Sequence, residues 1–477
     1  MIKELKNFLL LMVFITTIFS CNKKLEIAPE NTLVENEVFK TELGAEQAIS
    51  EVYYNFLNAE TNYFSYTYGD FTTPILIKSI NNTSYDLGQA SPVDYYVIGT
   101  WTAFFKAINS ANNVIKKIPL YGNFSDVKEK QFIAEAKFVR AYSFLHLLVL
   151  YGDGAFTGKM SGLGLPLQLT PFEGYNTGEI IPRSTNGEVY AQIVKDLTES
   201  IPDLPLKQAD DLKTRSRATK GGAYALLARA DLYMGKFADA ADAAKSVINL
   251  EPSVYTLTSN LRSLFPFNPD GTAQTLTAEY IFALPVSQLV STSTSITNGI
   301  SGAYFFKRSF WINPDFINEF DNGDLRVSQL MWKGDSIYNP DRLNDKTTFK
   351  FNNNFGRDNV PLIRYAEVLL TRAEALARTS GINQESIDLL NRIHQRSIPS
   401  AVSYTTADFG SATDLINKIL LERKHELAFE GLYRYDLLRT NQPLHSPDIP
   451  DNKKVLPIPQ IEIDISKGII IQNPGYL

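Results

Sequence analysis

The chain has 477 residues, of which 44% are hydrophobic and 21% are charged, a composition typical of a globular protein rather than a disordered one. Its formal net charge of −6 lacks the basic excess expected of a protein that binds nucleic acid. Its single cysteine excludes a disulfide within the chain and a metal site built from several thiolates.

The N-terminal segment is typical of a secretion signal. Two lysines precede an apolar run at 8–19, which is shorter than the roughly 20 residues needed to span a bilayer. The lone cysteine, Cys21, follows this run, and residues 18–21 resemble a bacterial lipobox. We therefore expect residues 1–20 to be removed as a lipoprotein signal peptide and Cys21 to carry lipid. The alternative is an ordinary secretion signal that leaves Cys21 as a free thiol.

Residues 220–252 follow the helix-turn-helix pattern of a tetratricopeptide repeat. Gly235 stands at the turn, and Ala240 and Ala244 stand where the second helix packs closely on the first. Asp231 departs from the pattern, because an aromatic residue is usual there. One such unit cannot bury its own apolar face, so we expect further helix pairs elsewhere in the chain.

Helical periodicity recurs along the rest of the chain. It predicts a long helix within 128–153, a pair of helices within 361–397 and another helix within 411–431. Residues 253–360 are richer in Asn, Ser, Thr and Pro, with one short strand at 280–284. The sequence thus predicts a mainly α-helical protein, with a tetratricopeptide-like helix-pair scaffold and an irregular, loop-rich portion packed on it.

Catalytic and metal-binding patterns are missing from the sequence. The four histidines fall in separate segments, and none has a second ligand at metal-binding spacing. His425 begins a zincin-like motif, but Phe429 replaces its second histidine. A stretch at 151–160 resembles a phosphate loop without its required Gly and Ser or Thr. We therefore expect no catalytic site, no metal and no cofactor.

Three glutamates recur at four-residue spacing near the C-terminus, where like charges on one helical face repel unless they are paired. They are Glu422, Glu426 and Glu430, with Arg423, Arg434 and Arg439 nearby. We expect these residues to form a structural ion network under the aromatic pair Tyr433 and Tyr435 rather than a catalytic site.

The aromatic content, 24 Tyr and 29 Phe, suggests a ligand site in loops where aromatic rings alternate with polar residues. Such rings stack on the apolar faces of sugars at little cost in side-chain entropy. Trp332 is the strongest candidate for such a contact. The other candidate ligand-binding residues are Tyr66, Tyr68, Asp70, Tyr85 and Trp311. Core packing is the alternative for each ring, since the alternation at 66–68 also fits a half-buried strand.

Several segments together resemble one family. The blocks at 132–153, 360–376, 419–439 and 455–476 are similar, in order and spacing, to those of the SusD/RagB family, which are surface lipoproteins of Bacteroidetes. Residues 101–115 and 311–326 look similar as well, which favours burial of Trp101.

The resemblance implies a right-handed tetratricopeptide-like superhelix, a lipid on Cys21 and a position on the outer membrane facing the cell exterior. It also implies a partner, a SusC-like TonB-dependent β-barrel transporter. The family captures oligosaccharides, or in some members peptides, without cleaving them and delivers them to this barrel.

We expect three regions: the signal peptide 1–20, an N-terminal helical region 21–252 and a C-terminal region 253–477. The last divides into an irregular part 253–360, a helical part 361–440 and a tail 441–477. The expected function is non-catalytic oligosaccharide capture. A tetratricopeptide-type scaffold or a peptide-capturing lipoprotein without a sugar site is the alternative. A secreted hydrolase ranks last, because no carboxylate pair can be identified for it.

Overall fold

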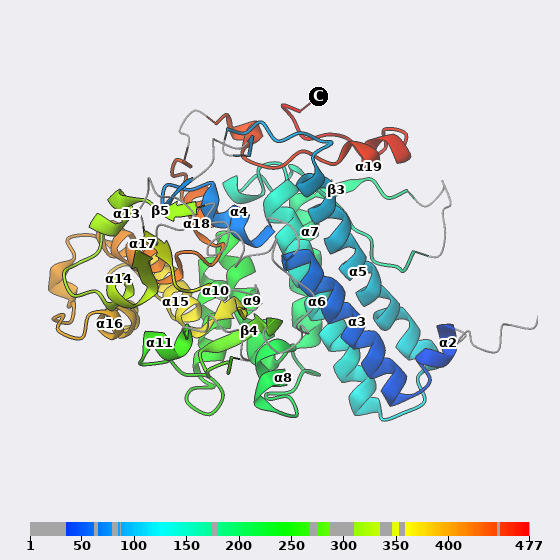
Figure 1. Ribbon diagram of the computed structural model, residues 1–477. Coiled ribbons are helices and arrows are strands. Elements are labelled where there is room, and N and C mark those ends of the chain that lie inside the picture. The colour runs from blue at the N-terminus through cyan, green and yellow to red at the C-terminus, as the bar shows by residue number, and fades with distance from the viewer. Residues whose placement is uncertain are drawn as a thin grey trace, which may run out of the picture.

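The computed structural model describes residues 35–61, 65–78, 84–85, 87–172, 180–266, 274–286, 310–333, 346–352, 358–445 and 449–476. As predicted, it is mostly helical (Figure 1). The helices before residue 252 are α2 (Glu35–Val38), α3 (Glu42–Thr61), α4 (Ser65–Phe71), α5 (Tyr95–Tyr121), α6 (Asp126–Tyr151), α7 (Asn186–Ser200), α8 (Asp211–Ser216), α9 (Lys220–Tyr233) and α10 (Phe237–Ile248). Those after it are α11 (Leu261–Leu264), α13 (Pro314–Asn318), α14 (Leu325–Leu330), α15 (Tyr365–Ser380), α16 (Gln384–Ser397), α17 (Ala412–Leu427), α18 (Tyr433–Arg439) and α19 (Gln460–Ile465).

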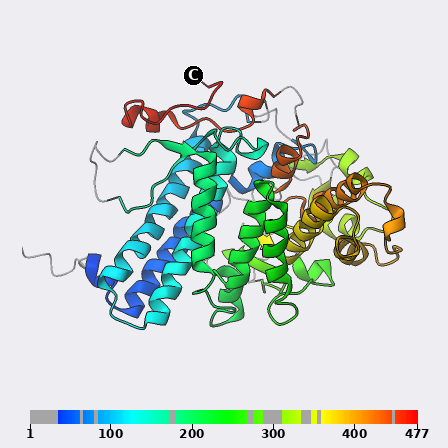
Figure 2. The same cartoon turned by 180° about the vertical axis from the view of Figure 1, so that it is seen from behind.

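The long helices form one continuous row. α3, α5, α6 and α7 lie side by side (Figure 1), and α7 contacts α9. From behind, the green pair α9 and α10 lies between these helices and the yellow to orange helices of the C-terminal region (Figure 2). α10 packs on α15, which in turn packs on α16 and α17. The expected regions 21–252 and 253–477 therefore share one helical scaffold.

The predicted tetratricopeptide-like unit is confirmed as the pair α9 and α10. Gly235 in the turn has a φ of 71°, a left-handed conformation that glycine adopts without strain. Ala240 and Ala244 are fully buried between neighbouring helices. Their small side chains let α9, α10 and α15 approach closely. The helix predicted within 128–153 is confirmed as α6, which ends before Gly152.

Within the residues that the structure describes, short strands make up four two-stranded antiparallel sheets rather than one large sheet. The pairs are β1 (Leu76–Lys78) with β5 (Phe310–Ile312), β2 (Leu163–Pro166) with β3 (Arg183–Thr185), β4 (Tyr280–Leu284) with β8 (Val360–Arg364), and β6 (Met331–Lys333) with β7 (Lys346–Thr348). The strand predicted at 280–284 is confirmed as β4. The periodicity placed residues 361–364 in a helix, but they form part of β8. They pair with β4, and their side chains are buried on both faces of this two-stranded sheet.

The C-terminal tail crosses the ends of the long helices. Leu456 N donates to Leu150 O at 2.7 Å, and Asn473 Nδ2 donates to Tyr151 O at 2.8 Å. These bonds satisfy carbonyl groups left unpaired at the C-terminus of α6. They hold α19 beside α5, near the C-terminus marked in Figure 1.

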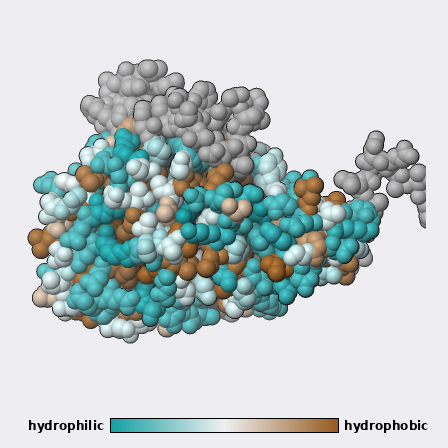
Figure 3. Space-filling view, turned by 90° about the horizontal axis from the view of Figure 1, so that it is seen from below, coloured by the Kyte–Doolittle hydropathy of each residue, from teal (hydrophilic) through white to brown (hydrophobic). Residues whose placement is uncertain are grey.

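The surface seen from below is mostly hydrophilic, with hydrophobic residues scattered among polar ones (Figure 3). Scattered apolar residues are usual on a folded protein and mark no interface by themselves. In the described part of the chain, no helix has both the length and the apolar character required to cross a membrane.

Replacing Ala240 with Leu should destabilise the fold, because the added atoms have no space between α9, α10 and α15. Overpacking of this kind costs about 1–3 kcal/mol in the free energy of unfolding. Urea denaturation measures the change. Ala238→Leu, at an exposed position of the same helix, is the matched control. Equal stabilities for the two variants would count against the close packing described.

Asp231 should make stability depend on pH. Burial, and then the nearby Asp239, raise the pKa of this carboxyl to about 7. The pKa of this carboxyl is thus higher in the folded protein than in the unfolded chain, where it is near 4. Its contribution to the stability of the fold is therefore complete only below about pH 4, and it is lost as the pH rises through 7. Asp231→Asn should therefore gain on the order of 1 kcal/mol relative to the parent at pH 8, and little at pH 4. Urea denaturation at both pH values, with the exposed Asp242→Asn as control, checks this. Parallel pH profiles for Asp231→Asn and the parent would show that the carboxyl is not responsible.

Candidate ligand-binding sites

The fold brings the sequence-predicted ligand residues into one region. α4 carries Tyr66, Tyr68 and Asp70, and it contacts β1. β1 pairs with β5, which carries Trp311. β5 contacts β7, and β7 pairs with β6, where Trp332 lies. Segments that lie far apart in the sequence therefore meet near α4, α13 and β5 in Figure 1.

Most of these candidates are buried. The exposed fractions are 4% for Tyr66, 5% for Tyr68, 0% for Asp70, 8% for Tyr85 and 1% for Trp311. A ring with so little exposed surface cannot offer its face to a ligand arriving from solvent. In this conformation the rings of Tyr66, Tyr68, Tyr85 and Trp311 therefore pack the floor of the region, the alternative that the sequence left open, and the Asp70 carboxylate is buried with them. The side chain of Trp332 lies outside the described residues, so its role stays a prediction. Cys21 and residues 1–20, the predicted signal peptide, also lie outside them.

Specific contacts explain the burial. The Phe71 ring stacks on Phe310, with centroids 5.3 Å apart, and Tyr68 meets Phe71 edge-on at 5.5 Å. The Tyr66 hydroxyl donates to Pro361 O at 2.9 Å. The Tyr85 hydroxyl donates to Asp94, which caps the N-terminus of α5. Burial of these phenols is stabilised by satisfied hydrogen bonds and ring packing.

α4 packs against the turn that follows α17. Asp70 Oδ2 accepts a hydrogen bond from Gly431 N at 2.6 Å. A Cβ added to Gly69 would lie 1.8 Å from Gly431 O, so only glycine fits at this close approach. These contacts hold residues 65–71 as a helix rather than the half-buried strand that the alternation of tyrosines also allowed.

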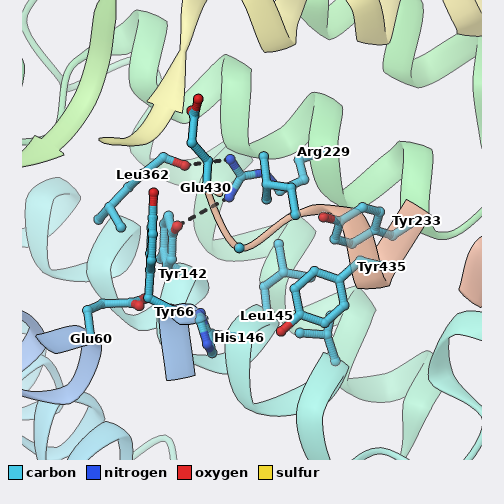
Figure 4. Close-up of a pocket in the computed structure, with 13 residues that line it drawn as sticks. Glu60, Tyr66, Tyr142, Leu145, His146, Arg229, Tyr233, Leu362, Glu430 and Tyr435 are labelled. Carbon is cyan, nitrogen blue, oxygen red and sulfur yellow. Dashed lines mark hydrogen bonds and ion pairs between the residues drawn. The ribbon is translucent and has the colours of Figure 1, made fainter. Parts of the chain in front are cut away.

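Tyr66 is one of the residues that line a small internal cavity (Figure 4). Glu60, His146 and Tyr435 line it from three different helices, and its volume is about 30 Å³. Glu60 Oε1 lies 3.1 Å from His146 Nδ1. The volume suits about two water molecules and excludes a sugar ring. The cavity therefore belongs to the scaffold.

The glutamates with four-residue spacing do form a buried ion network, as predicted, but with other partners. Glu426 lies 2.9 Å from Arg364 and also pairs with Arg396, and Glu430 lies 2.7 Å from Arg364. Glu422 pairs with Arg326 at 2.7 Å. The arginines nearby in sequence bind elsewhere: Arg423 to Asp436, Arg434 to Thr72 and Lys454, and Arg439 to Glu374 and Asp436. Helix geometry turns Arg423 to a different side of α17 from Glu422 and Glu426.

The network keeps these carboxylates ionised. Burial alone would raise the pKa of Glu422, but Arg326 and His394 lower it to about 2. The pKa of Glu426 is likewise lowered against burial by Arg396, Arg364 and Arg326. Carboxylates held in this way by charged partners stabilise the fold and are not poised to exchange protons near neutral pH.

Replacing Arg364 with Met should remove the buried cation that bonds to Glu279, Glu426 and Glu430 together. Breaking a buried ion pair from one side costs about 3–5 kcal/mol of unfolding free energy. Urea denaturation measures this loss. Arg378→Met, which removes a more exposed arginine from Glu374, is the control and should cost at most about 1 kcal/mol. Should Arg364→Met fail to fold, Arg364→Lys must fold and be less stable than the parent. Parent-like stability of both Arg364 variants would contradict the network's role.

A groove that the sequence did not reveal lies between α5, residues 166–172 and α19. Its volume is about 640 Å³, within the range of ligand sites. Its lining includes Trp101, Phe105, Asn109, Gln168, Phe172, Ile465 and Glu462. Trp101 is buried in the groove wall, as predicted. The parts of the groove are scattered in sequence, so periodicity gave no signal for it.

Two family models match the chain. A model described as "SusD family" matches residues 335–446, and one described as "Starch-binding associating with outer membrane" matches residues 25–232. SusD-like protein P2 from Formosa agariphila is 25% identical over 98% of each chain. A SusD-like protein from Bacteroides ovatus is 23% identical over 73% of this chain and 66% of the other.

Solved structures share the fold. A SusD superfamily protein from Bacteroides thetaiotaomicron superposes with a TM-score of 0.76 and 25% identity, covering 91% of this chain and 100% of the other. A laminarin-binding SusD-like protein superposes with a TM-score of 0.72 and 21% identity, covering 92% and 100%. The second likeness establishes similarity of fold only.

Proposed function

Because the chain belongs to the SusD-like family, we propose that it binds oligosaccharides without cleaving them. We further propose that it delivers them to a SusC-like TonB-dependent β-barrel transporter for import. The observation that carries the proposal is the match of residues 25–232 to a family described as starch-binding and associating with the outer membrane. A neighbour of the same fold that binds laminarin supports a carbohydrate as the ligand class.

The proposed ligand site is the region where α4, β5 and β6 meet. Its floor is rigid, because the aromatic rings of α4 and β5 pack tightly and the Asp70 carboxylate bonds to Gly431. A rigid base lets ligand-contacting side chains bind with little loss of entropy, and Trp332 on β6 is the side chain we propose for this contact. Sugar faces would stack on such a ring, and neighbouring polar groups would bond the hydroxyls.

Binding without cleavage is supported by the state of the clustered carboxylates. Glycoside hydrolysis uses two carboxyl groups, one of which must hold a proton near neutral pH. The clustered glutamates of α17 are instead buried and paired with arginines, which lower their pKa values. They therefore suit a structural role.

Attachment to the outer membrane is proposed through lipid on Cys21, after removal of residues 1–20. The lipobox-like residues 18–21 and the family description support this proposal. Mass spectrometry of the protein from a native membrane fraction should find a lipid-modified peptide that begins at Cys21. An unmodified cysteine there would contradict the anchor.

The proposed function is tested with the soluble protein that begins at Asn22. It is screened against laminarin, soluble starch and a panel of other glycans, and calorimetry follows on each hit. The recovered ligand is then analysed by mass spectrometry. A specific glycan bound and recovered intact supports the proposal. Shortened products would indicate a hydrolase, and binding of peptides alone would favour peptide capture.

Trp332→Ala should weaken the binding of the glycan found in this screen by about three- to tenfold, the value of one aromatic contact. The free energy of unfolding should change by no more than about 0.5 kcal/mol, as for a surface position. Calorimetry and urea denaturation measure the two effects. Tyr54→Ala, which removes a ring that is 63% exposed on α3, is the control. Unchanged affinity would remove Trp332 from the site.

A further inference from the structure

The groove between α5, residues 166–172 and α19 has the chemistry of a second ligand site. It lies apart from the region proposed above, since α19 and β5 stand on different sides of the molecule in Figure 1. Its lining combines apolar and aromatic side chains with a few polar groups, the usual composition of a binding groove.

Two aromatic rings stand in the groove. Phe172 is 61% exposed and lines the groove. Its backbone is held, because Phe172 N donates to Asn109 Oδ1 at 2.7 Å. Phe105 is partly exposed, and the buried ring of Trp101 supports it from behind, with centroids 4.8 Å apart. The groove thus presents ring surface on a rigid base.

Two amides beside these rings have fixed orientations. Asn109 Oδ1 accepts the bond from Phe172, which leaves the Asn109 Nδ2 group as a donor. Gln168 Nε2 donates to Thr170 O at 2.7 Å, which leaves Gln168 Oε1 as an acceptor. Within the described ranges, neither remaining group has a protein partner. One donor and one acceptor beside ring surface match a sugar hydroxyl, which both accepts and donates.

The charges of the groove favour a neutral ligand. Glu462 is partly buried in its wall, where the Trp101 indole N–H donates to it. Burial raises the pKa of this carboxyl, and the bond from Trp101 opposes the rise. When ionised, Glu462 would repel an anionic sugar across the low-dielectric wall. Lys116, at another part of the lining, would not favour a cationic one.

We propose that this groove is a second carbohydrate site that binds a neutral oligosaccharide, with Phe172 and Phe105 stacking on sugar rings and Asn109 and Gln168 bonding hydroxyls. The proposal rests on the proposed function for its ligand class, but it assigns a separate site. A second site would lengthen the stretch of glycan that one molecule holds and raise its overall affinity through effective concentration.

The test uses the protein that begins at Asn22, with laminarin and soluble starch as probes. Hydrogen–deuterium exchange followed by mass spectrometry should show slower exchange of residues 166–172 when the bound probe is present. Phe172→Ala should weaken binding of that probe by about three- to tenfold and abolish the protection. Phe172→Tyr, which keeps the ring, should restore both. Tyr54→Ala, which removes a ring of matched exposure on α3, should bind as the parent does.

The outcomes separate this proposal from the preceding one. A parent protein that binds a probe, with no protection of residues 166–172 and unchanged affinity in Phe172→Ala, would overturn the groove site and leave the proposed function standing. Binding of neither probe would count against both proposals. Protection of residues 166–172 by peptides of a casein digest, and not by either glycan, would overturn the carbohydrate assignment of the groove.

Discussion

The structure depends on the buried guanidinium of Arg364. Its side chain is fully buried, and it bonds to Glu426 and Glu430 near the C-terminal end of α17 and to Glu279 just before β4. Arginine suits this position because its planar fork reaches several carboxylates at once and stays charged when buried. Lys350, just after β7, joins the same cluster through Glu430 at 2.6 Å. Charges thus tie the irregular portion of the chain to the helical scaffold.

This constraint also positions the candidate ligand region. Glu430 is fixed by Arg364. The next residue, Gly431, donates its backbone N–H to Asp70 of α4 and packs closely against Gly69 of the same helix. α4 in turn packs on β1 and, through Phe71, on β5. Successive short contacts therefore connect the ion network to the strands that border the proposed site. Loss of the network should disrupt the packing of these strands before it separates the long helices.

The helices could be predicted from the sequence because their signals are local. The apolar spacing of α6 and the glycines that follow it and α9 are each contained within a few turns of chain. The small residues Ala240 and Ala244 likewise predicted a close helix pair, although the partner helices were not known. The family blocks agreed with this scaffold, and the comparisons support them.

The remaining features depend on contacts that are distant in sequence. Tyr66 is buried because its hydroxyl meets Pro361, and Asp70 because it meets Gly431. Neither partner is visible from the tyrosine-rich segment alone, so exposed and buried rings could not be distinguished. The partners of Glu426 were mistaken for the same reason, since Arg364 lies on a strand that periodicity assigned to a helix. The second groove was missed because Asn109, Phe172 and Glu462 come from three separate segments.

We propose that the protein holds an intact oligosaccharide on its surface. A crystal structure of the protein that begins at Asn22, grown with the glycan that binds best, is the decisive measurement. We expect density for an uncleaved glycan beside β5 and β6, with ring surfaces stacked on its sugars. Density for a cleaved glycan in a cleft between two carboxylates, or for a glycan bound only on the long helices α3 and α7, would contradict it.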